Sequence, residues 1–386
     1  MDVIVISLCL TAWAYLVFAR GGFWMCNVRD DAPIAAPQDG WPAVTAIVPA
    51  RDEAEVIARS VRSLLRQDYP GRLSLIVVDD SSSDGTAEIA RDAASTFEHG
   101  RSMTVITGSP PPAGWTGKLW ALAQGVRMAS RQDAAPAYLL LTDADIAHAP
   151  DTLSWLVAHA TRGGYVLTSL MARLRCRSFA ERFHVPAFIY FFQMLFPFAW
   201  VCGPHARHAA AAGGCMLVRA DALQKAGGIE SIRGALIDDC ALATRLKAQG
   251  PIWLGLTQRV HSLRAYRTFS DVCGMVARSA YAQLGYSPLA LIATTVAMIL
   301  VFILPVPFAL LATGFSQAAG GAAWLAMAIT FQPVLRYYRL SPLWGLALPA
   351  IASLYVLYTL LSAYQHMRGR GGHWKGRVHL RAQGLS

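Results

Sequence analysis

Three acidic clusters hold the residues of this 386-residue chain that are best suited to chemistry. They are Asp79-Asp80 after the apolar run LSLIVV, Asp143 and Asp145 after AYLLLT, and Asp238-Asp239 ahead of CALATRLKAQG. Carboxylates this close repel one another unless a cation, a hydrogen-bond donor or a proton lies between them. Three such clusters around one sheet would suit a site that holds a metal–nucleotide complex and moves a proton.

The elements that position these clusters begin near residue 44. Apolar, strand-like runs (VTAIVP, LSLIVVD, MTVIT and AYLLLT) alternate with helix-like patterns, one of them near Lys118–Ser130. Continuous apolar strands that alternate with helices predict an α/β fold whose mostly parallel sheet is covered on both faces. Ligands of such sheets bind beyond the carboxyl ends of the strands. The first two acidic clusters occupy such positions.

The C-terminal part is apolar enough for a membrane. No Asp, Glu, Lys or Arg occurs between Arg278 and Arg336, or from 340 to 367. A bilayer core needs about 20 apolar residues per helix, so both runs predict transmembrane helices. Three spans, at about 289–311, 319–335 and 342–365, would place the C-terminus opposite the α/β domain. The choice between two and three spans stays open.

The N-terminal run from Val3 to Ala19 predicts an uncleaved anchor. A secretory signal is the alternative, but no basic residue precedes the run and no small-residue cleavage site follows it. Arg20 and Arg29 lie just beyond it, which favours a cytoplasmic location for the next domain. The aromatic segment 179–202 is either a buried helix pair or an in-plane segment at the membrane surface.

The chain is basic, with a net charge of +10, and part of this charge lies after the last apolar run. Basic residues after the last apolar run would be attracted to anionic headgroups, although three spans would put them against the positive-inside bias. No basic stripe interleaved with aromatics indicates nucleic-acid binding. Seven cysteines without C-x-x-C spacing fit a reducing compartment.

The predicted order of the chain's parts is an anchor (1–20), a linker (21–42), the α/β domain (43–262), an interfacial connector (263–286), a transmembrane region (287–366) and a basic cytoplasmic tail (367–386).

Five segments in order resemble the family 2 glycosyltransferases of the GT-A fold. They are TAIVPARDE (45–53), VVDDSSSDGT (77–86), LTDADI (141–146), GGCMLVRADAL…GGI (213–229) and DDCALATRL (238–246). The resemblance covers roughly residues 44–262, and it implies a Rossmann-like mixed sheet that binds a nucleotide sugar. The stretches GWTGKLWAL and HARHAAAAGGCMLVRADAL are most similar to the hopene-associated glycosyltransferases.

The resemblance implies roles for the donor side of the site. Asp145 matches the D-x-D carboxylate that holds Mg²⁺ or Mn²⁺. Asp143 matches the other carboxylate of that motif, which contacts the ribose, the metal ion and the water bound to the metal. Asp80 matches the carboxylate that accepts a hydrogen bond from the base, typically uracil. The nucleotide-binding loop is matched by Pro49, Ala50, Arg51 and Glu53, with Arg51 reaching the diphosphate. Lys118, in a glycine loop before a helix, could neutralise phosphate.

The third cluster matches the family's acid pair, except that Asp238 occupies the supporting position where the family usually has Glu. Asp239 matches the general base, which implies a single displacement with inversion. The alternative for this pair is a helix N-terminal acid pair. The Q-x-x-R-W signature of processive members is absent: the comparable stretch, MVARSAYAQL, has Arg278 but no glutamine three residues before it and no tryptophan after it.

These patterns together predict a metal-dependent, inverting glycosyltransferase in the inner membrane, multi-pass, with its catalytic domain in the cytoplasm. It would move one sugar from a nucleotide-diphosphate sugar, with a UDP-sugar favoured, to a lipid acceptor related to hopanoids. The alternatives are a processive polysaccharide synthase and a non-catalytic nucleotide-binding membrane scaffold. The sequence names neither the donor sugar, nor the lipid, nor the oligomeric state.

Overall fold

The computed structural model describes residues 2–95, 101–203, 208–369, 373–374 and 377–378. The chain divides into two compact units. The sheet unit comprises Val28–Leu174, Val201–Arg264 and Trp374–Ser386, and the helical unit comprises Met1–Asn27, Arg175–Trp200 and Ala265–His373. The domain limits predicted from sequence stay predictions. Of the predicted basic tail, Arg370, Lys375 and Arg381 lie outside the described residues.

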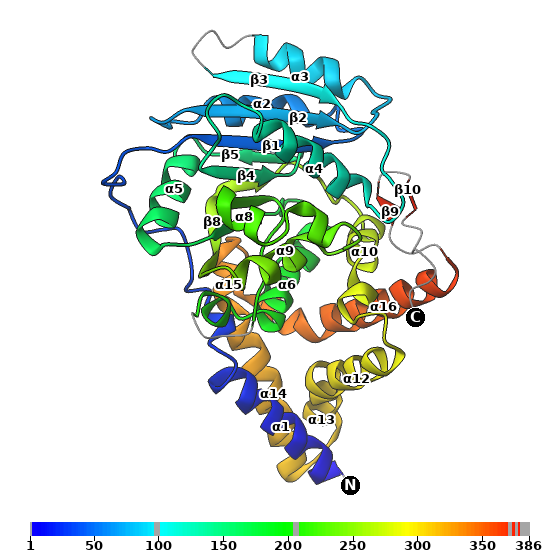
Figure 1. The fold of residues 1–386 in the computed structure, drawn as a ribbon. Coiled ribbons are helices and arrows are strands. Elements are labelled where there is room, and N and C mark those ends of the chain that lie inside the picture. The colour runs from blue at the N-terminus through cyan, green and yellow to red at the C-terminus, as the bar shows by residue number, and fades with distance from the viewer. Residues whose placement is uncertain (1, 96–100, 204–207, 370–372, 375–376, 379–386) are drawn as a thin grey trace. The chain divides into compact units, whose positions relative to one another are not determined.

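The sheet unit is built on an eight-stranded mixed sheet in the order β3-β2-β1-β4-β7-β6-β8-β5 (Figure 1). Strands β3, β2, β1 and β4 are parallel neighbours, as the alternating pattern predicts. β7 runs antiparallel to both β4 and β6, which makes the sheet mixed. The strands are β1 (Val44–Ala50), β2 (Leu73–Asp79), β3 (Ser102–Thr107), β4 (Tyr138–Thr142), β5 (Ile146–His148), β6 (Leu167–Arg173), β7 (Cys215–Arg219) and β8 (Ile252–Ser262).

Helices cover both faces of this sheet, so that every residue of β1, β2 and β4 is buried, and most of these residues are apolar. Val44, Ala46 and Val48 share a core cluster with residues of α2, α3 and α5. Ile47, which points to the other face, lies against Gly125 of α4, where glycine permits close approach. The helices are α2 (Ile57–Leu65), α3 (Thr86–Ser95), α4 (Gly117–Ala129), α5 (Thr152–Gly163), α8 (Ala220–Lys225), η2 (Ile229–Ile232) and α9 (Asp238–Lys247).

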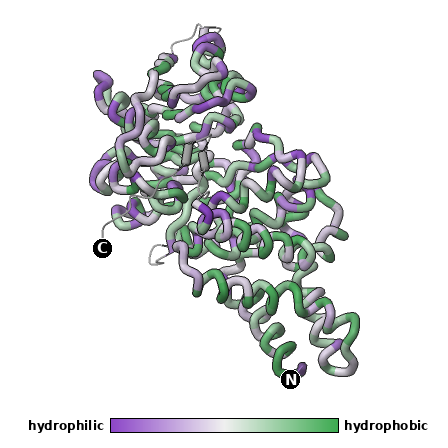
Figure 2. Tube along the Cα trace, turned by 90° about the vertical axis from the view of Figure 1, so that its right-hand side faces the viewer, coloured by the Kyte–Doolittle hydropathy of each residue, from purple (hydrophilic) through white to green (hydrophobic). Residues whose placement is uncertain are grey.

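The helical unit contains the long apolar helices expected from sequence. Among the described residues, three helices are long and apolar enough to cross a membrane: Pro288–Leu311, Gly314–Tyr337 and Pro342–Met367. The second is longer than the predicted 319–335, because Pro333 lies in the first turn of a following helix, where proline is tolerated. Figure 2 shows hydrophobic residues dominating the part of this unit near the N-terminus. The N-terminal helix α1 (Asp2–Phe18) has 17 residues, at the short end for a span.

The remaining elements of the helical unit pack around these apolar helices. Leu300 and Val301, in a π-helical turn, offer their carbonyl oxygens to Cys9 and Trp13 of α1 at 3.0 and 2.8 Å. These two contacts attach α1 to the π-helical turn. The elements are η1 (Phe23–Met25), α6 (Phe179–Leu195), α7 (Phe198–Cys202), α10 (Phe269–Ala277), α11 (Ala280–Gln283), α12 (Pro288–Met298), η3 (Ile299–Ile303), α13 (Pro305–Leu311), α14 (Gly314–Thr330), α15 (Gln332–Tyr337), η4 (Pro342–Ala347) and α16 (Leu348–Met367).

The aromatic segment 179–202 forms α6 and α7. Phe191 is buried, with its ring 5.5 Å from that of Phe302 and 5.1 Å from that of Tyr355. It therefore packs inside the unit, as the buried-helix interpretation expects. Phe179, at the start of α6, is 64% exposed. One segment thus combines a buried face with an exposed aromatic residue.

Candidate active site

Strand register brings the acidic loops to one edge of the sheet. Ala50 pairs with Asp79 across β1 and β2, so the loops after these two strands begin side by side. β4 is parallel to β1 on its other side and ends at Thr142, directly before the D-x-D residues. Thr142 also pairs with Cys215 at the start of β7, and its hydroxyl donates to the carbonyl of Gly214 at 2.7 Å. The glycine pair before β7 therefore lies beside the end of β4.

Lys118 joins the second and third acidic clusters. Its Nζ lies 2.8 Å from Oδ1 of Asp143 and 3.0 Å from Oδ2 of Asp238. Lys118 is in the first turn of α4, which Thr116 caps by accepting from the N–H of Leu119. The two carboxylates come from different elements, the turn after β4 and the start of α9. A lysine placed between them removes most of their mutual repulsion.

The charges around Lys118 set the pKa values of the cluster. Burial alone would lower the pKa of Lys118, but Asp143 and Asp238 more than offset it, and the net pKa is raised. Burial raises the pKa of Asp143, opposed by Lys118 and assisted by Asp145. The lysine therefore stays charged, while the buried carboxylates share one cation among several negative charges. Such a site favours a ligand that brings further positive charge.

Asp239 is held by the backbone on both of its oxygens. Oδ2 accepts from the N–H of Gly213 at 2.9 Å, and Oδ1 accepts from the N–H of Cys240 at 2.7 Å. Burial, and then the charge of Asp238, raise the pKa of Asp239 to about 6, although Lys118 acts in the opposite direction. A carboxyl with this pKa is mostly ionised at neutral pH and is a better proton acceptor than an ordinary aspartate.

Arg264 is a site residue that sequence reasoning missed. Its Nε donates to Oδ2 of Asp145 and its Nη2 donates to Oε1 of Glu53, both at 2.7 Å. Arg264 follows the end of β8, and the N–H of Leu263 donates to the carbonyl of Asp145 at 2.7 Å. One arginine beyond a long strand carries no signal in a single sequence. Only the return of β8 beside the D-x-D turn reveals it.

The expected nucleotide-binding loop lies against the loop after β2. Pro49 and Ala50 end β1, and the carbonyl of Ala50 accepts from the N–H of Asp80 at 2.8 Å. Arg51 lies over Asp80, with Nη1 3.6 Å from its Oδ2, and only 1% of Asp80 is exposed. Asp52 has a φ of 50°, and its Oδ1 accepts from the N–H of Ser83 at 2.9 Å. Asp52 thus ties the two loops together, and Arg51 covers the carboxylate expected at the base.

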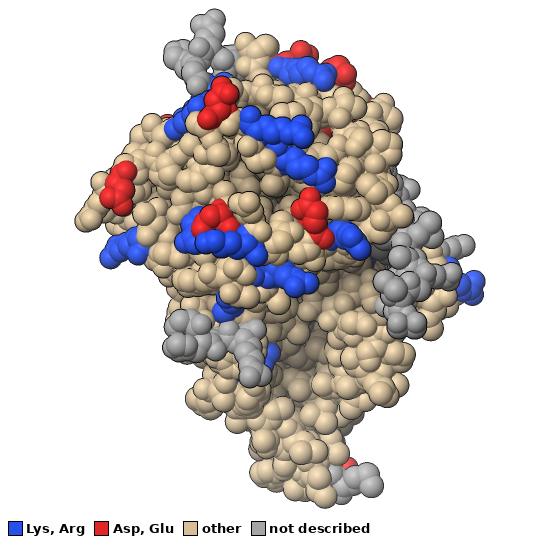
Figure 3. Space-filling view, in the orientation of Figure 1, with Lys and Arg blue, Asp and Glu red and all other residues tan. Residues whose placement is uncertain are grey.

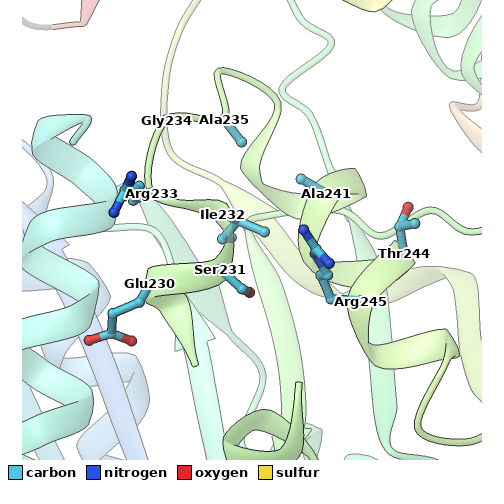
Figure 4. A pocket seen from close by; sticks show the side chains of 9 residues that line it. All are labelled: Glu230, Ser231, Ile232, Arg233, Gly234, Ala235, Ala241, Thr244 and Arg245. Atoms are coloured by element: carbon cyan, nitrogen blue, oxygen red, sulfur yellow. The ribbon is translucent and has the colours of Figure 1, made fainter. Parts of the chain in front are cut away.

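A pocket of about 580 Å³ lies between α9 and the segment formed by η2 and the turn that follows it. Figure 4 shows Arg245 extending from α9 between the two segments, while Glu230 points away from the pocket. Glu230 is paired there with Arg127 of α4 at 3.3 Å. The pocket leaves space next to the helix that begins with the acid pair. Its lining residues are Glu230, Ser231, Ile232, Arg233, Gly234, Ala235, Ala241, Thr244 and Arg245.

Asp143 and Asp145 fit a divalent cation of the Mg²⁺ or Mn²⁺ type. Both offer carboxylate oxygens, and each already neutralises a cationic side chain, Lys118 or Arg264. Within the part of the chain that the structure describes, no group of three or more His, Cys, Asp or Glu could hold a metal ion. Two carboxylates suit an ion that takes its other ligands from phosphate oxygens and water, as Mg²⁺ commonly does.

Comparison with known proteins identifies the family of this chain. The family described as "glycosyltransferase like family 2" matches residues 42–254, which is more than half of the chain. The chain therefore belongs to that family. The predicted family and its class of activity, glycosyl transfer, are confirmed at this level. The association with hopanoids is not part of this match and stays a proposal.

Two curated relatives match over short stretches. The chain is 30% identical over 120 residues to the probable glycosyltransferase YdaM of Bacillus subtilis, covering 29% of this chain and 28% of that protein. It is 37% identical over 59 residues to the glycosyltransferase AglE of Haloferax volcanii, covering 15% of this chain and 19% of that protein. The aligned stretches thus span less than a third of either relative.

A solved structure extends the likeness to nearly the whole chain. The mannosyltransferase PcManGT from Pyrobaculum calidifontis, in complex with GDP-Man and Mn²⁺, superposes with a TM-score of 0.56. The superposition covers 95% of this chain and 98% of that one, at 20% sequence identity. At this identity the likeness shows the fold, which agrees with the expected GT-A architecture.

Proposed function

We propose that this chain is a metal-dependent, inverting glycosyltransferase that moves one sugar from a nucleotide-diphosphate sugar to a membrane lipid. The supporting observation is Lys118, whose contacts with Asp143 and Asp238 bring the D-x-D turn and the acid pair of α9 together in a family 2 domain. A donor held at the first and an acceptor activated at the second would then share one site.

Asp239 is the proposed general base. An acceptor hydroxyl would attack the anomeric carbon, the bond from that carbon to the diphosphate oxygen would break, and the hydroxyl proton would pass to Asp239. Attack from the face opposite the nucleotide inverts the configuration. The N–H groups of Gly213 and Cys240 hold both oxygens of Asp239, which limits rotation of the carboxylate during this transfer.

The donor would bind along the loops at the strand ends. Asp143 and Asp145 would hold the divalent ion, and Lys118 would add positive charge near the phosphates. When bound, Mg²⁺ or Mn²⁺ would neutralise the diphosphate as it departs. The similar mannosyltransferase holds GDP-Man with Mn²⁺, which supports a nucleotide-sugar donor here. The proposed contact of Asp80 with the base favours uracil and requires Arg51 to move aside.

The acceptor is proposed to be a lipid, because the same chain carries three helices apolar enough to cross a membrane. We place the protein in the inner membrane with its catalytic domain in the cytoplasm. The stretches GWTGKLWAL and HARHAAAAGGCMLVRADAL support a hopanoid-related acceptor. Residues 205–207 of the second stretch lie outside the described residues.

The activity is tested on full-length protein in detergent with UDP- and GDP-sugars, measuring release of nucleotide diphosphate. Asp145→Ala should abolish transfer and weaken nucleotide binding. Asp239→Asn should lower the rate by about 10²–10⁴-fold while leaving nucleotide affinity unchanged. Asp221→Asn, at a surface carboxylate that is 49% exposed, is the matched control. Unchanged turnover in EDTA together with an active Asp239→Asn variant would contradict the proposal.

The acceptor is tested separately, in cells with and without the protein. Thin-layer separation of their lipids, followed by mass spectrometry of the band that differs, identifies what is glycosylated. Loss of a glycolipid with a triterpenoid core is the expected result. An identical lipid profile alongside normal nucleotide-sugar turnover would show that the acceptor is not a membrane lipid.

A further inference from the structure

The long helix α16 belongs to a candidate span by length and composition, Pro342–Met367. An apolar helix of this length can also lie in the membrane surface, and hydropathy alone does not separate the two arrangements. We propose that α16 lies along the surface of the bilayer, with its outer face among the lipids, and does not cross it. The proposal is independent of the sugar-transfer reaction.

The first observation is the direction of the helices within the helical unit. α1, α13 and α14 pack along one another, whereas α16 runs across them (Figure 1). α16 packs mainly on α6, α10, α11, α12 and η3. Transmembrane helices tilt on average by about 20° from the bilayer normal. If α14 crosses the membrane, a helix that runs across α14 lies closer to the membrane plane.

The second observation is the set of polar anchors on the inner face of α16. Tyr355 donates through its hydroxyl to the carbonyl of His184, and the Tyr358 hydroxyl lies 3.1 Å from Nε2 of the same histidine. Ser362 accepts from the N–H of Tyr281 at 3.1 Å and donates to the carbonyl of Ala277. These three side chains recur at helical spacing and therefore share one face.

The elements that hold this inner face carry exposed charges. Arg182 is exposed on α6, and Asp271 and Arg278 are exposed on and just after α10. Charged side chains facing hydrocarbon are costly, so α6 and α10 belong at or outside the headgroup region. Since α16 is fastened to them from Tyr355 to Ser362, this stretch of the helix lies at a similar depth.

The third observation is the outer face of α16, which is exposed and apolar. Leu357 is 56% exposed, Tyr364 is 49% exposed and Met367 is 74% exposed. Arg368 lies over the ring of Tyr364, 5.1 Å from its centroid. An apolar face with tyrosine and arginine at its end is typical of helices that lie at the lipid headgroups. The exposed leucines would otherwise form an uncovered apolar patch.

The basic residues support the same arrangement. Arg336 and Arg339 precede the segment and Arg368 follows α16, and all three are exposed. On the face shown in Figure 3, the surface over α1 and α12–α14 has no Lys or Arg. With α16 in the plane, every basic residue of the C-terminal region stays on one side, next to an anionic leaflet. A third span would move the basic tail to the side of the uncharged turn Ala312–Thr313, against the positive-inside bias.

The membrane sidedness is tested with protease sites in the full-length chain. One variant carries a site between Ala312 and Thr313, and the other carries the same site after Ser386. Cleavage is measured in sealed inside-out vesicles and in spheroplasts from the same cells. If the spans Pro288–Leu311 and Gly314–Tyr337 cross and α16 lies in the plane, the two sites are cut from opposite sides. Cutting of both sites from the same side would overturn the proposal.

A matched pair of lysine substitutions tests the depth of α16. Leu325 of α14 and Leu357 of α16 are 59% and 56% exposed, and each lies near the middle of its candidate span. Leu325→Lys should reduce the protein recovered in membranes by about tenfold or more, because lysine at a bilayer centre opposes insertion. Leu357→Lys should change recovery by less than about twofold, since the ammonium can reach headgroups. Equal losses would show that α16 crosses the membrane.

Discussion

Lowering the pH from about 7 to about 5 should protonate Asp239 and slow sugar transfer. Burial and the neighbouring Asp238 raise the pKa of Asp239 to about 6, well above the usual 3.8. At pH 7 about nine-tenths of this carboxyl is ionised, and at pH 5 about one-tenth is, so kcat/KM should fall roughly tenfold between them. A carboxyl with an ordinary pKa would remain more than about nine-tenths ionised at pH 5, and the rate would hardly change.

The assay is kcat/KM for the acceptor at saturating donor and metal, using full-length protein in detergent. Asp221→Asn should keep the acidic limb of the pH profile, that is, the fall of kcat/KM at low pH, because that carboxyl is on the surface and outside the site. Asp239→Asn should remove the limb along with most of the activity. A wild-type rate that is flat from about pH 5 to pH 7 would refute the assigned pKa, the assigned role, or both.

Protonation of Asp239 should slow sugar transfer but should increase the free energy of unfolding. A carboxyl whose folded-state pKa is raised contributes stability below its unfolded pKa and loses it as the pH rises through the folded value. The contribution of Asp239 should therefore disappear as the pH passes about 6. Thermal unfolding of the wild type and of Asp239→Asn checks this: the Tm advantage of the wild type, if any, should shrink across that range and not grow.

Three further substitutions are informative. Lys118→Met should move the acidic limb to higher pH, because the lysine charge lowers the pKa of the base; an unmoved limb would mean that this charge is screened. Arg264→Gln should tighten Mn²⁺ binding in the presence of nucleotide by about two- to fivefold, measured by calorimetry, since it removes the cation 2.7 Å from Asp145. Weaker binding would instead make the arginine part of the donor site. Gly125→Ala should cost about 1–3 kcal/mol of unfolding free energy, because its Cβ would lie 2.4 Å from a methyl of β1. Gly274→Ala, which meets nothing within 4 Å, is the control and should not lower the Tm.

The sequence alone predicted the α/β sheet and the position of its acidic loops. This succeeded because buried parallel strands require continuous apolar runs, and because the carboxyl ends of such strands meet at one edge. Asp80 and Asp143 follow β2 and β4 as expected. The apolar helices were predicted equally well. The number of consecutive apolar residues gives the length of the helix, and this length can be compared directly with the thickness of the bilayer's hydrocarbon core.

The tertiary structure decided which charges meet. Lys118, Asp143 and Asp238 come from separate elements, and only the fold places the lysine between the two carboxylates. Arg264 carried no pattern at all, and it reaches Asp145 because β8 returns beside β4's loop. The pKa of Asp239 could not be read from residue types either, because burial and neighbouring charges set it.

The direction of α16 shows the same division. Its composition determined that it would be helical and apolar, and it matched a span in length and hydropathy. Whether such a helix runs along or across the membrane depends on what its inner face is attached to. Tyr355, Tyr358 and Ser362 bond to elements that carry exposed charges, and those contacts exist only between segments far apart in sequence. Hydropathy is a property of single residues, whereas direction is a property of packing.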